Sequence, residues 1–117
     1  MICVFLNVRS EFMSWAYLVL AGIFEIGFTT SLKLSDNFSK VWPSVSFLVL
    51  SILSFYFLTR ATQTIPLGTS YAVWTGIGAL GTAVVGIVFF MEPVTASRIF
   101  FLLMLISSII GLKLVSN

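Results

Sequence analysis

The sequence has few charged residues, a single cysteine and no histidine. Only 9% of its 117 residues are Asp, Glu, Lys or Arg, whereas soluble domains carry about 25%. Because Cys3 has no second cysteine to pair with, an intrachain disulfide is excluded, and no Cys or His spacing suits a metal ion. The basic residues are scattered and the net charge is only +2, so nucleic acid is not expected as a partner. We expect no cofactor, and no enzyme, since no pair of nucleophile and base is visible.

Hydrophobic residues make up 59% of the chain, and the mean hydropathy is +1.13. A helix needs roughly 20 mostly apolar residues to cross a bilayer. None of the apolar runs alternates as the strand of a membrane barrel does, so helices are favoured. The sequence therefore predicts an all-α integral membrane protein with four transmembrane helices. The runs are Trp15–Leu32, Trp42–Leu58, Tyr71–Met91 and Val94–Leu114.

The first twelve residues, MICVFLNVRSEF, stand apart from the apolar runs. They make a poor signal peptide, because their apolar stretch is short and the charges of Arg9 and Glu11 follow it. We predict a disordered N-terminal extension over residues 1–12, ahead of an alternative start at Met13. Residues 13–117 are predicted to form one four-helix domain.

Short segments with turn-forming residues separate the four runs. Asp36 and Asn37 favour a turn after the first run, and Pro43 suits the first turn of the second helix. The segment Ile65–Gly68 predicts a type I turn, and Glu92-Pro93 predicts the end of the third helix. Connections this short predict that consecutive helices are antiparallel neighbours.

The basic residues give no clear orientation in the membrane. With four spans, each side of the bilayer receives three Lys or Arg residues, so the positive-inside rule has no asymmetry to act on. One hypothesis is that the chain inserts both ways and that two oppositely oriented copies pair. The alternative is a fixed topology set by other features. The two sets are Arg9, Arg60 and Lys113 on one side and Lys33, Lys40 and Arg98 on the other.

Glu25 lies near the middle of the first apolar run. An ionised carboxylate at the centre of a bilayer costs about 3 kcal/mol on insertion scales, so such residues usually face an interior cavity and serve a pathway. The alternative is a protonated, hydrogen-bonded acid with a structural role only. Helical spacing places five residues on the face of Glu25, namely Leu18, Gly22, Phe28, Thr29 and Leu32, and Gly22 is expected to open room beside the acid.

The second and third runs each carry a stripe of hydroxyl, aromatic and small residues. Two interpretations are open for their hydroxyls, because serine and threonine can line a site but also allow close helix packing or bond back to their own helix. The glycines of the third run, including Gly78, Gly81 and Gly86, are expected to serve packing. The stripes are Ser44, Phe47, Ser51, Ser54, Phe55 and Leu58 in the second run, and Tyr71, Trp74, Thr75 and Gly78 in the third.

A carboxylate beside aromatic rings describes a site for an organic cation. The faces of Phe28, Tyr71 and Trp74 would attract a cation, and a desolvated ring contact contributes about 2 kcal/mol. Glu25 could then exchange a proton for that cation. In a pair of copies the two Glu25 carboxyls would lie close together and titrate as a coupled pair.

Three segments closely resemble the small multidrug resistance family, whose members are four-helix proton-coupled exporters that work as antiparallel dimers in the bacterial inner membrane. The resemblance covers Met13 to about Lys113. PLGTSYAVWTGIGALG, over residues 66–81, is similar to the guanidinium exporter subtype, and its WTGIG separates that subtype from quaternary ammonium exporters. FFMEPVTASRIF, over residues 89–100, and IIGLK, over residues 109–113, also resemble the family.

The resemblance implies roles for individual residues. It makes Glu25 the carboxylate shared by protons and substrate, and Tyr71 the residue that couples the two sites of the dimer. It makes Ser54 and Trp74 hydrogen-bonding partners of the carboxylates. Lys33 matches a family lysine at the end of the first helix, and the segment Ile109–Gly111 would form much of the dimer contact.

Phe28 departs from the guanidinium subtype, which usually has Trp at this position. Phe28 cannot donate an indole hydrogen bond, and the Thr29-Thr30 that follows resembles the quaternary ammonium subtype. We therefore predict a proton-coupled antiporter of guanidinium, substituted guanidinium and small quaternary ammonium ions. The alternatives are a broad quaternary ammonium exporter, a small dual-topology ion channel, and a subunit that is active only beside a related chain.

Overall fold

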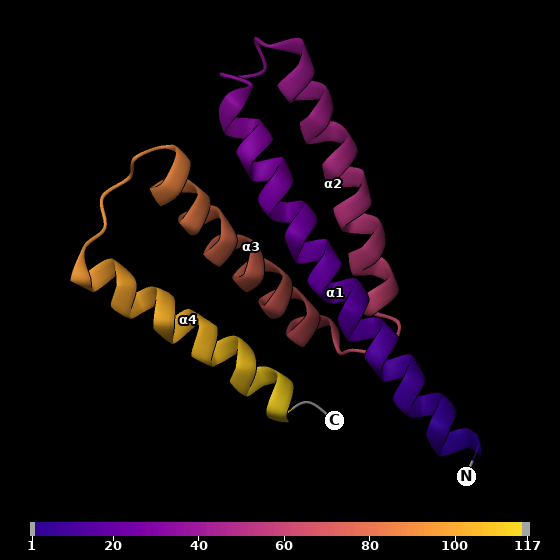
Figure 1. The fold of residues 1–117 in the computed structure, drawn as a ribbon. Coiled ribbons are helices and arrows are strands. Elements are labelled where there is room, and N and C mark those ends of the chain that lie inside the picture. The colour runs from indigo at the N-terminus through magenta and orange to yellow at the C-terminus, as the bar shows by residue number, and fades with distance from the viewer. Residues whose placement is uncertain (1, 116–117) are drawn as a thin grey trace.

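The computed structural model describes residues 2–115, and it describes side chains from Arg9 onward. Four helices make up nearly all of the described chain (Figure 1). All four are long and apolar enough to cross a membrane, which confirms the predicted all-α membrane fold. The helices are α1 (Ile2–Leu34), α2 (Val41–Ala61), α3 (Leu67–Phe89) and α4 (Ala96–Val115).

The first helix begins well before the predicted apolar run. It starts at Ile2 and includes residues that were predicted from the sequence to be disordered. The helix continues through this stretch because residues 2–12 contain neither Pro nor Gly to end it. The division of the chain at Met13 stays a prediction.

The helices form one flat layer in the order α2, α1, α3, α4 (Figure 1). The layer measures 53 × 36 × 19 Å along its principal axes. The α1/α2 and α3/α4 pairs are antiparallel neighbours, as predicted from their short connections. The prediction is wrong for α2 and α3, because α1 lies between them and they meet through a few side chains such as Ser54 and Trp74.

Residues in the left-handed backbone conformation follow the ends of α1 and α3. Asp36, Asn37 and Phe38 have φ values of 49°, 61° and 65°, and Asp36 and Asn37 belong to residue types that tolerate this conformation. The predicted turn after the first run is therefore confirmed. The third helix ends at Phe89, because Met91 is also left-handed (φ 56°) and its neighbour Glu92 donates its backbone N–H to the carbonyl of Gly86 at 3.1 Å.

The turn predicted at Ile65–Gly68 lies a few residues earlier. Residues 62–65 form the turn, and Pro66 is the N-cap of α3 with φ −53°. Proline suits a helix start because its fixed φ is close to the helical value and it has no N–H to satisfy. The third helix therefore starts at Leu67 rather than at Tyr71.

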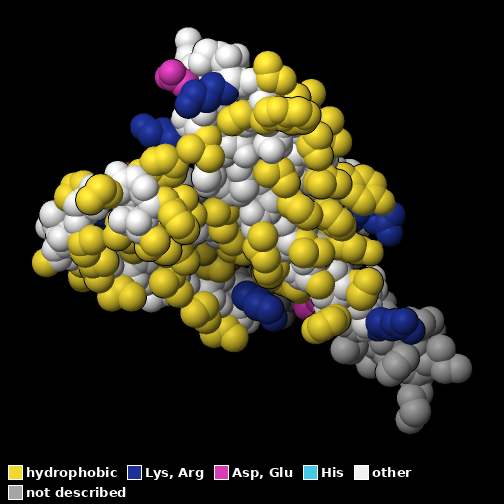
Figure 2. Space-filling view, turned by 45° about the horizontal axis from the view of Figure 1, so that its top comes forward, with side chains coloured by type: hydrophobic (Ala, Val, Ile, Leu, Met, Phe, Trp, Pro, Cys, Tyr) yellow, Lys and Arg dark blue, Asp and Glu magenta, His cyan; other side chains and the backbone are white. Residues whose placement is uncertain are grey.

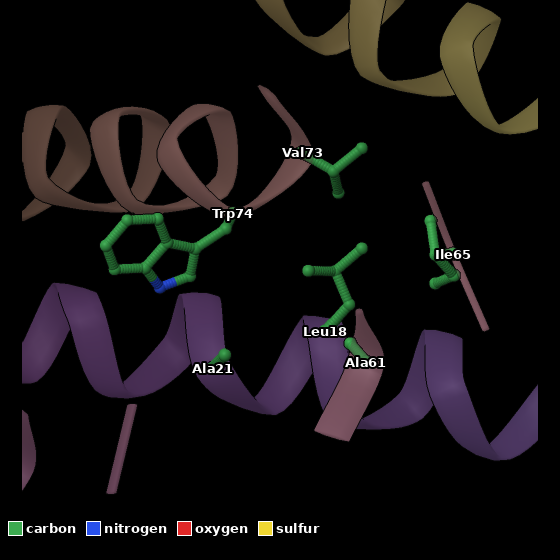
Figure 3. Packing of buried hydrophobic residues seen from close by; sticks show 6 residues of the cluster. All are labelled: Leu18, Ala21, Ala61, Ile65, Val73 and Trp74. Atoms are coloured by element: carbon green, nitrogen blue, oxygen red, sulfur yellow. The ribbon is translucent and has the colours of Figure 1, made fainter. Parts of the chain in front are cut away.

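A small apolar core fills the region where α1, α2 and α3 converge (Figure 3). Figure 3 shows Leu18 and Ala21 of α1 facing Val73 and Trp74 of α3. Ala61, the last residue of α2, and Ile65 of the α2–α3 connection close this core, and Ile65 is only 4% exposed. The most deeply buried apolar residues therefore lie at the end of the α1–α3 contact that is close to the α2–α3 connection.

The last helix is joined to the layer only along one side. It packs against α3 and contains no buried residue. Large apolar side chains such as Phe101, Leu103 and Ile110 are more than half exposed. Figure 2 shows hydrophobic side chains over most of the visible face and only small, separate patches of Lys and Arg. In a membrane this apolar surface faces lipid or another protein.

Candidate functional site

Glu25 lies in the last third of α1, more than two turns from the helix end, and faces α3. Its carboxylate rests on the backbone of Gly78, where a Cβ atom would overlap it. Glu25 Oε1 is buried, and no group among the described residues hydrogen-bonds to it. A buried acceptor without a partner is costly, so this carboxylate is poised for a proton or a cationic ligand rather than for a structural bond within the chain.

Glycines bring α1 and α3 close together around the acid. A Cβ atom on Gly81 would overlap Ile26, and one on Gly22 would meet the side chain of Ile77. The packing role expected for Gly78 and Gly81 is therefore confirmed. The expected open space beside Gly22 is wrong, because Ile77 fills it.

Ser54 and Trp74 bond to each other rather than to the acid. Trp74 Nε1 donates to Ser54 Oγ at 3.0 Å, and Ser54 Oγ donates to the carbonyl oxygen of Ala21 at 2.7 Å. Ala21 lies one helical turn before Glu25, and both side chains are buried, Ser54 completely and Trp74 to 7% exposure. Within one protomer, these two hydrogen bonds fix the indole ring of Trp74 next to the site. Direct bonds from Ser54 or Trp74 to a carboxylate stay a prediction.

Most other hydroxyls of the predicted stripes bond to their own helix. Ser44, Ser51 and Thr75 donate to backbone carbonyls four residues earlier, at 2.6, 2.6 and 2.8 Å. For these three residues, the interpretation that the hydroxyls bond back to their own helix is confirmed. Ser54 differs because it reaches across to another helix.

A row of aromatic rings runs from α1 across α2 to α3. Phe28 lies 6.4 Å from Phe55 between ring centroids, and Phe55 lies 5.4 Å from Trp74. Tyr71 continues the row at 5.9 Å from Trp74 and is 59% exposed. The structure thus brings together the rings that the sequence assigned to a cation site, and Tyr71 stands at the open end of the row.

Thr29 and Thr82 form a second polar link between α1 and α3. Their hydroxyl oxygens are 2.7 Å apart, one helical turn beyond Glu25 and Gly78 respectively. Both line a cavity of about 140 Å³ together with Lys33 and Glu92. Thr29 was predicted from its spacing to Glu25, whereas Thr82 was missed, although its spacing of four from Gly78 places it on the same face of α3.

The charged groups that line this cavity have partners of their own. Lys33 Nζ lies 6.0 Å from the ring centroid of Phe90, and Glu92 forms an ion pair with Arg98 at 2.7 Å. In the described part of the chain, no group of three or more acidic, Cys or His residues is placed to hold a metal ion. Glu25 lies against Gly78 within the α1–α3 contact, whereas Lys33 and Glu92 line the neighbouring cavity.

Comparison with known proteins gives consistent matches. A family model described as Small Multidrug Resistance protein matches residues 13–106. A guanidinium exporter of Yersinia pestis is 46% identical over 104 residues, which cover 89% of this chain and 100% of the relative. Guanidinium exporters of Proteus vulgaris and Escherichia coli K12 are 43% and 44% identical, over 89% and 87% of this chain and 100% and 97% of their own lengths.

Proposed function

This chain belongs to the small multidrug resistance family, and we propose that it exports small organic cations across the bacterial inner membrane in exchange for protons. Relatives that are 40–46% identical are named guanidinium exporters, which supports guanidinium and substituted guanidinium ions as substrates. The exchange takes place at Glu25, where a proton and the cation compete for one carboxylate.

The observation that carries this proposal is the unpartnered carboxylate of Glu25. The chain has four acidic residues, and Glu25 is the one that lies in the interior of a span. Its buried Oε1 has no hydrogen-bond partner among the described side chains and backbone groups. A guanidinium ion suits such an acceptor because its planar fork of N–H donors can meet a carboxylate with two parallel hydrogen bonds.

The aromatic row shapes the rest of the substrate site. Phe28 follows Glu25 by three residues and Trp74 precedes Gly78 by four, so each ring lies about one helical turn from the acid or its contact, and ring faces attract a positive charge. Phe28 donates no hydrogen bond, so this part of the site is more apolar than a tryptophan would make it. This supports a substrate range that includes substituted guanidinium and small quaternary ammonium ions.

We propose that two oppositely inserted copies form the working transporter. The balanced Lys and Arg residues support insertion in both directions, and the unburied face of α4, including Ile110, supports a contact with a second copy. Two copies related in this way supply the inverted symmetry that larger transporters build within one chain. The exposed Tyr71 would then couple the two Glu25 sites, and the dimer would open to one side at a time.

Exchange of two protons for one monovalent cation would move one net positive charge inward in each cycle. That charge releases about 2.3 kcal/mol for each 100 mV of membrane potential. The membrane potential would then add to the proton gradient as a driving force for export.

The test is guanidinium-driven proton movement in proteoliposomes that contain the purified chain. Glu25→Gln should abolish exchange, whereas Glu11→Gln, a matched change at the exposed start of the same helix, should leave it unchanged. Because protons compete for the carboxylate, apparent guanidinium affinity should weaken as the pH falls, by at most about tenfold per pH unit for each proton displaced. Near-normal exchange by Glu25→Gln would refute the proposal.

The same preparation separates the rival functions. Tetramethylammonium responses equal to or larger than guanidinium responses would favour a broad quaternary ammonium exporter. A current that ignores the pH gradient would favour an ion channel. Silence of this chain alone, with activity restored by a related chain, would favour a heterodimer.

A further inference from the structure

A polar pocket lies between α1 and the end of α2, away from Glu25. Its volume is about 560 Å³. Met13 and Tyr17 belong to its lining, and the six other lining side chains are polar. These side chains are Ser10, Ser14, Thr59, Arg60, Gln63 and Thr64.

The pocket lies at the level of the lipid headgroups. The 21 residues of α2 span about 32 Å, close to the hydrocarbon thickness of about 30 Å, and Arg60 is the second-last residue of that helix. On α1, Ser10 of the pocket lies shortly before the apolar run that begins at Trp15. Both walls of the pocket therefore reach the membrane surface at the same end of the molecule.

Arg60 is held in place but keeps its hydrogen-bond donors available. Its guanidinium carbon lies 5.5 Å from the ring centroid of Tyr17. A guanidinium stacked on a ring points its N–H groups outward in its own plane. Among the side chains that the structure describes, Arg60 forms no ion pair and donates no hydrogen bond, since the one ion pair joins Glu92 and Arg98.

The surrounding groups favour an anion. The hydroxyls of Ser14 and Thr64 donate to no acceptor among the described residues, so they can also donate into the pocket. This end of the molecule carries Arg9, Arg60 and Lys113 with Glu11 as its one acidic residue. Glu11 and Lys113 line a different pocket on α1, so the charge near Arg60 is positive.

We propose that this pocket binds the headgroup of an anionic phospholipid. The phosphodiester accepts hydrogen bonds from the Arg60 guanidinium and from the Ser14 and Thr64 hydroxyls, while the acyl chains lie along the apolar surface of α1 and α2. Arginine matches the geometry of phosphate oxygens, and basic pockets between transmembrane helices bind anionic headgroups. This site is separate from the transport site and does not depend on the proposed exchange.

The experiment is native mass spectrometry of the full chain titrated with phosphatidylglycerol and, separately, with phosphatidylcholine. The unmodified chain should bind phosphatidylglycerol more tightly. Arg60→Gln should weaken phosphatidylglycerol binding roughly fivefold, the loss expected for one basic residue at a membrane surface, and should leave phosphatidylcholine binding unchanged. The affinity of Arg60→Lys for phosphatidylglycerol should lie between those of the unmodified chain and Arg60→Gln, because lysine keeps the charge but lacks the fork of donors.

Matched variants separate this site from general attraction to positive charge. Lys40→Gln removes an exposed basic residue at the opposite end of α2 and should leave phosphatidylglycerol binding unchanged. Thr64→Ala, also exposed, should weaken it two- to fivefold through the loss of one hydroxyl donor. Equal losses in Lys40→Gln and Arg60→Gln would overturn the proposal.

A third arm distinguishes a lipid headgroup from free phosphate. Inorganic phosphate should neither bind measurably nor displace phosphatidylglycerol, because the acyl chains contribute to lipid binding. Displacement by inorganic phosphate at millimolar concentration would show a phosphate site and overturn the lipid assignment.

Discussion

Replacing Gly78 by alanine places a methyl group where the Glu25 carboxylate lies. The carboxylate is the end of a flexible side chain, so we expect it to rotate away while α1 and α3 stay packed. A displaced carboxylate loses the charge-assisted hydrogen bonds of a guanidinium ion, which contribute about 1.5–3 kcal/mol. Apparent substrate affinity should therefore weaken about 10- to 100-fold.

Two further glycines serve as matched controls for this variant. Gly81→Ala meets the side chain of Ile26, so it strains the same helix contact without touching the acid. Overpacking of this kind costs about 1–3 kcal/mol of stability, and we expect Gly81→Ala to affect thermal stability more than substrate affinity. Gly68→Ala has no atom within 4 Å of the new Cβ and should change neither.

The assay is guanidinium-evoked current from reconstituted protein over a range of concentrations, with thermal stability measured in detergent. Wild-type affinity in Gly78→Ala would refute the reasoning, because the carboxylate would then bind substrate in a position that Gly78 does not determine. A parallel loss of affinity in Gly81→Ala would show that helix spacing, rather than the position of the acid, limits binding.

Two other variants test the surroundings of the acid. Ser54→Ala leaves the buried Trp74 N–H without an acceptor and should cost about 1–3 kcal/mol in thermal denaturation, whereas Ser51→Ala, whose hydroxyl bonds only to its own helix, should cost less than about 1 kcal/mol. Phe28→Trp adds an indole N–H that can donate to the Glu25 carboxylate and hold it for the paired N–H donors of guanidinium, so it should raise the preference for guanidinium over tetramethylammonium, which has no N–H to donate, by up to about tenfold in exchange assays. An unchanged preference would show that Phe28 does not face the substrate.

The four spans could be predicted because the free energy of placing a residue in a bilayer depends mainly on its residue type, whatever its neighbours are. Their ends were harder to place. The start of α3 was predicted at Tyr71, yet Pro66 caps the helix and lets it begin at Leu67, before the apolar run. Helix ends depend on local capping geometry, which hydropathy does not report.

The full order of the helices in the layer could not be read from the sequence. Short connections predicted α2 beside α3, but α1 lies between them. The reason lies in pairs of side chains on different helices, such as Ile26 against Gly81 and Ile77 against Gly22. A sequence shows which residues share a face of one helix, but it does not show which face of another helix that face contacts.

The same limit explains what was and was not predicted at the site. Glu25 could be identified because an acid inside a span is costly wherever that span packs. Ser54 and Trp74 were placed on site-facing stripes, but their bond to each other depends on the position of α2 against α3. Thr82 was missed because its significance comes from Thr29 on another helix.

The single layer of helices has a geometric consequence for any solute. Helices laid side by side in a molecule 19 Å thick enclose only the small core around Leu18 and Trp74. A solute bound to Glu25 along the α1–α3 contact is therefore covered by this chain on one side only. The remaining wall of a sealed chamber has to come from outside the chain.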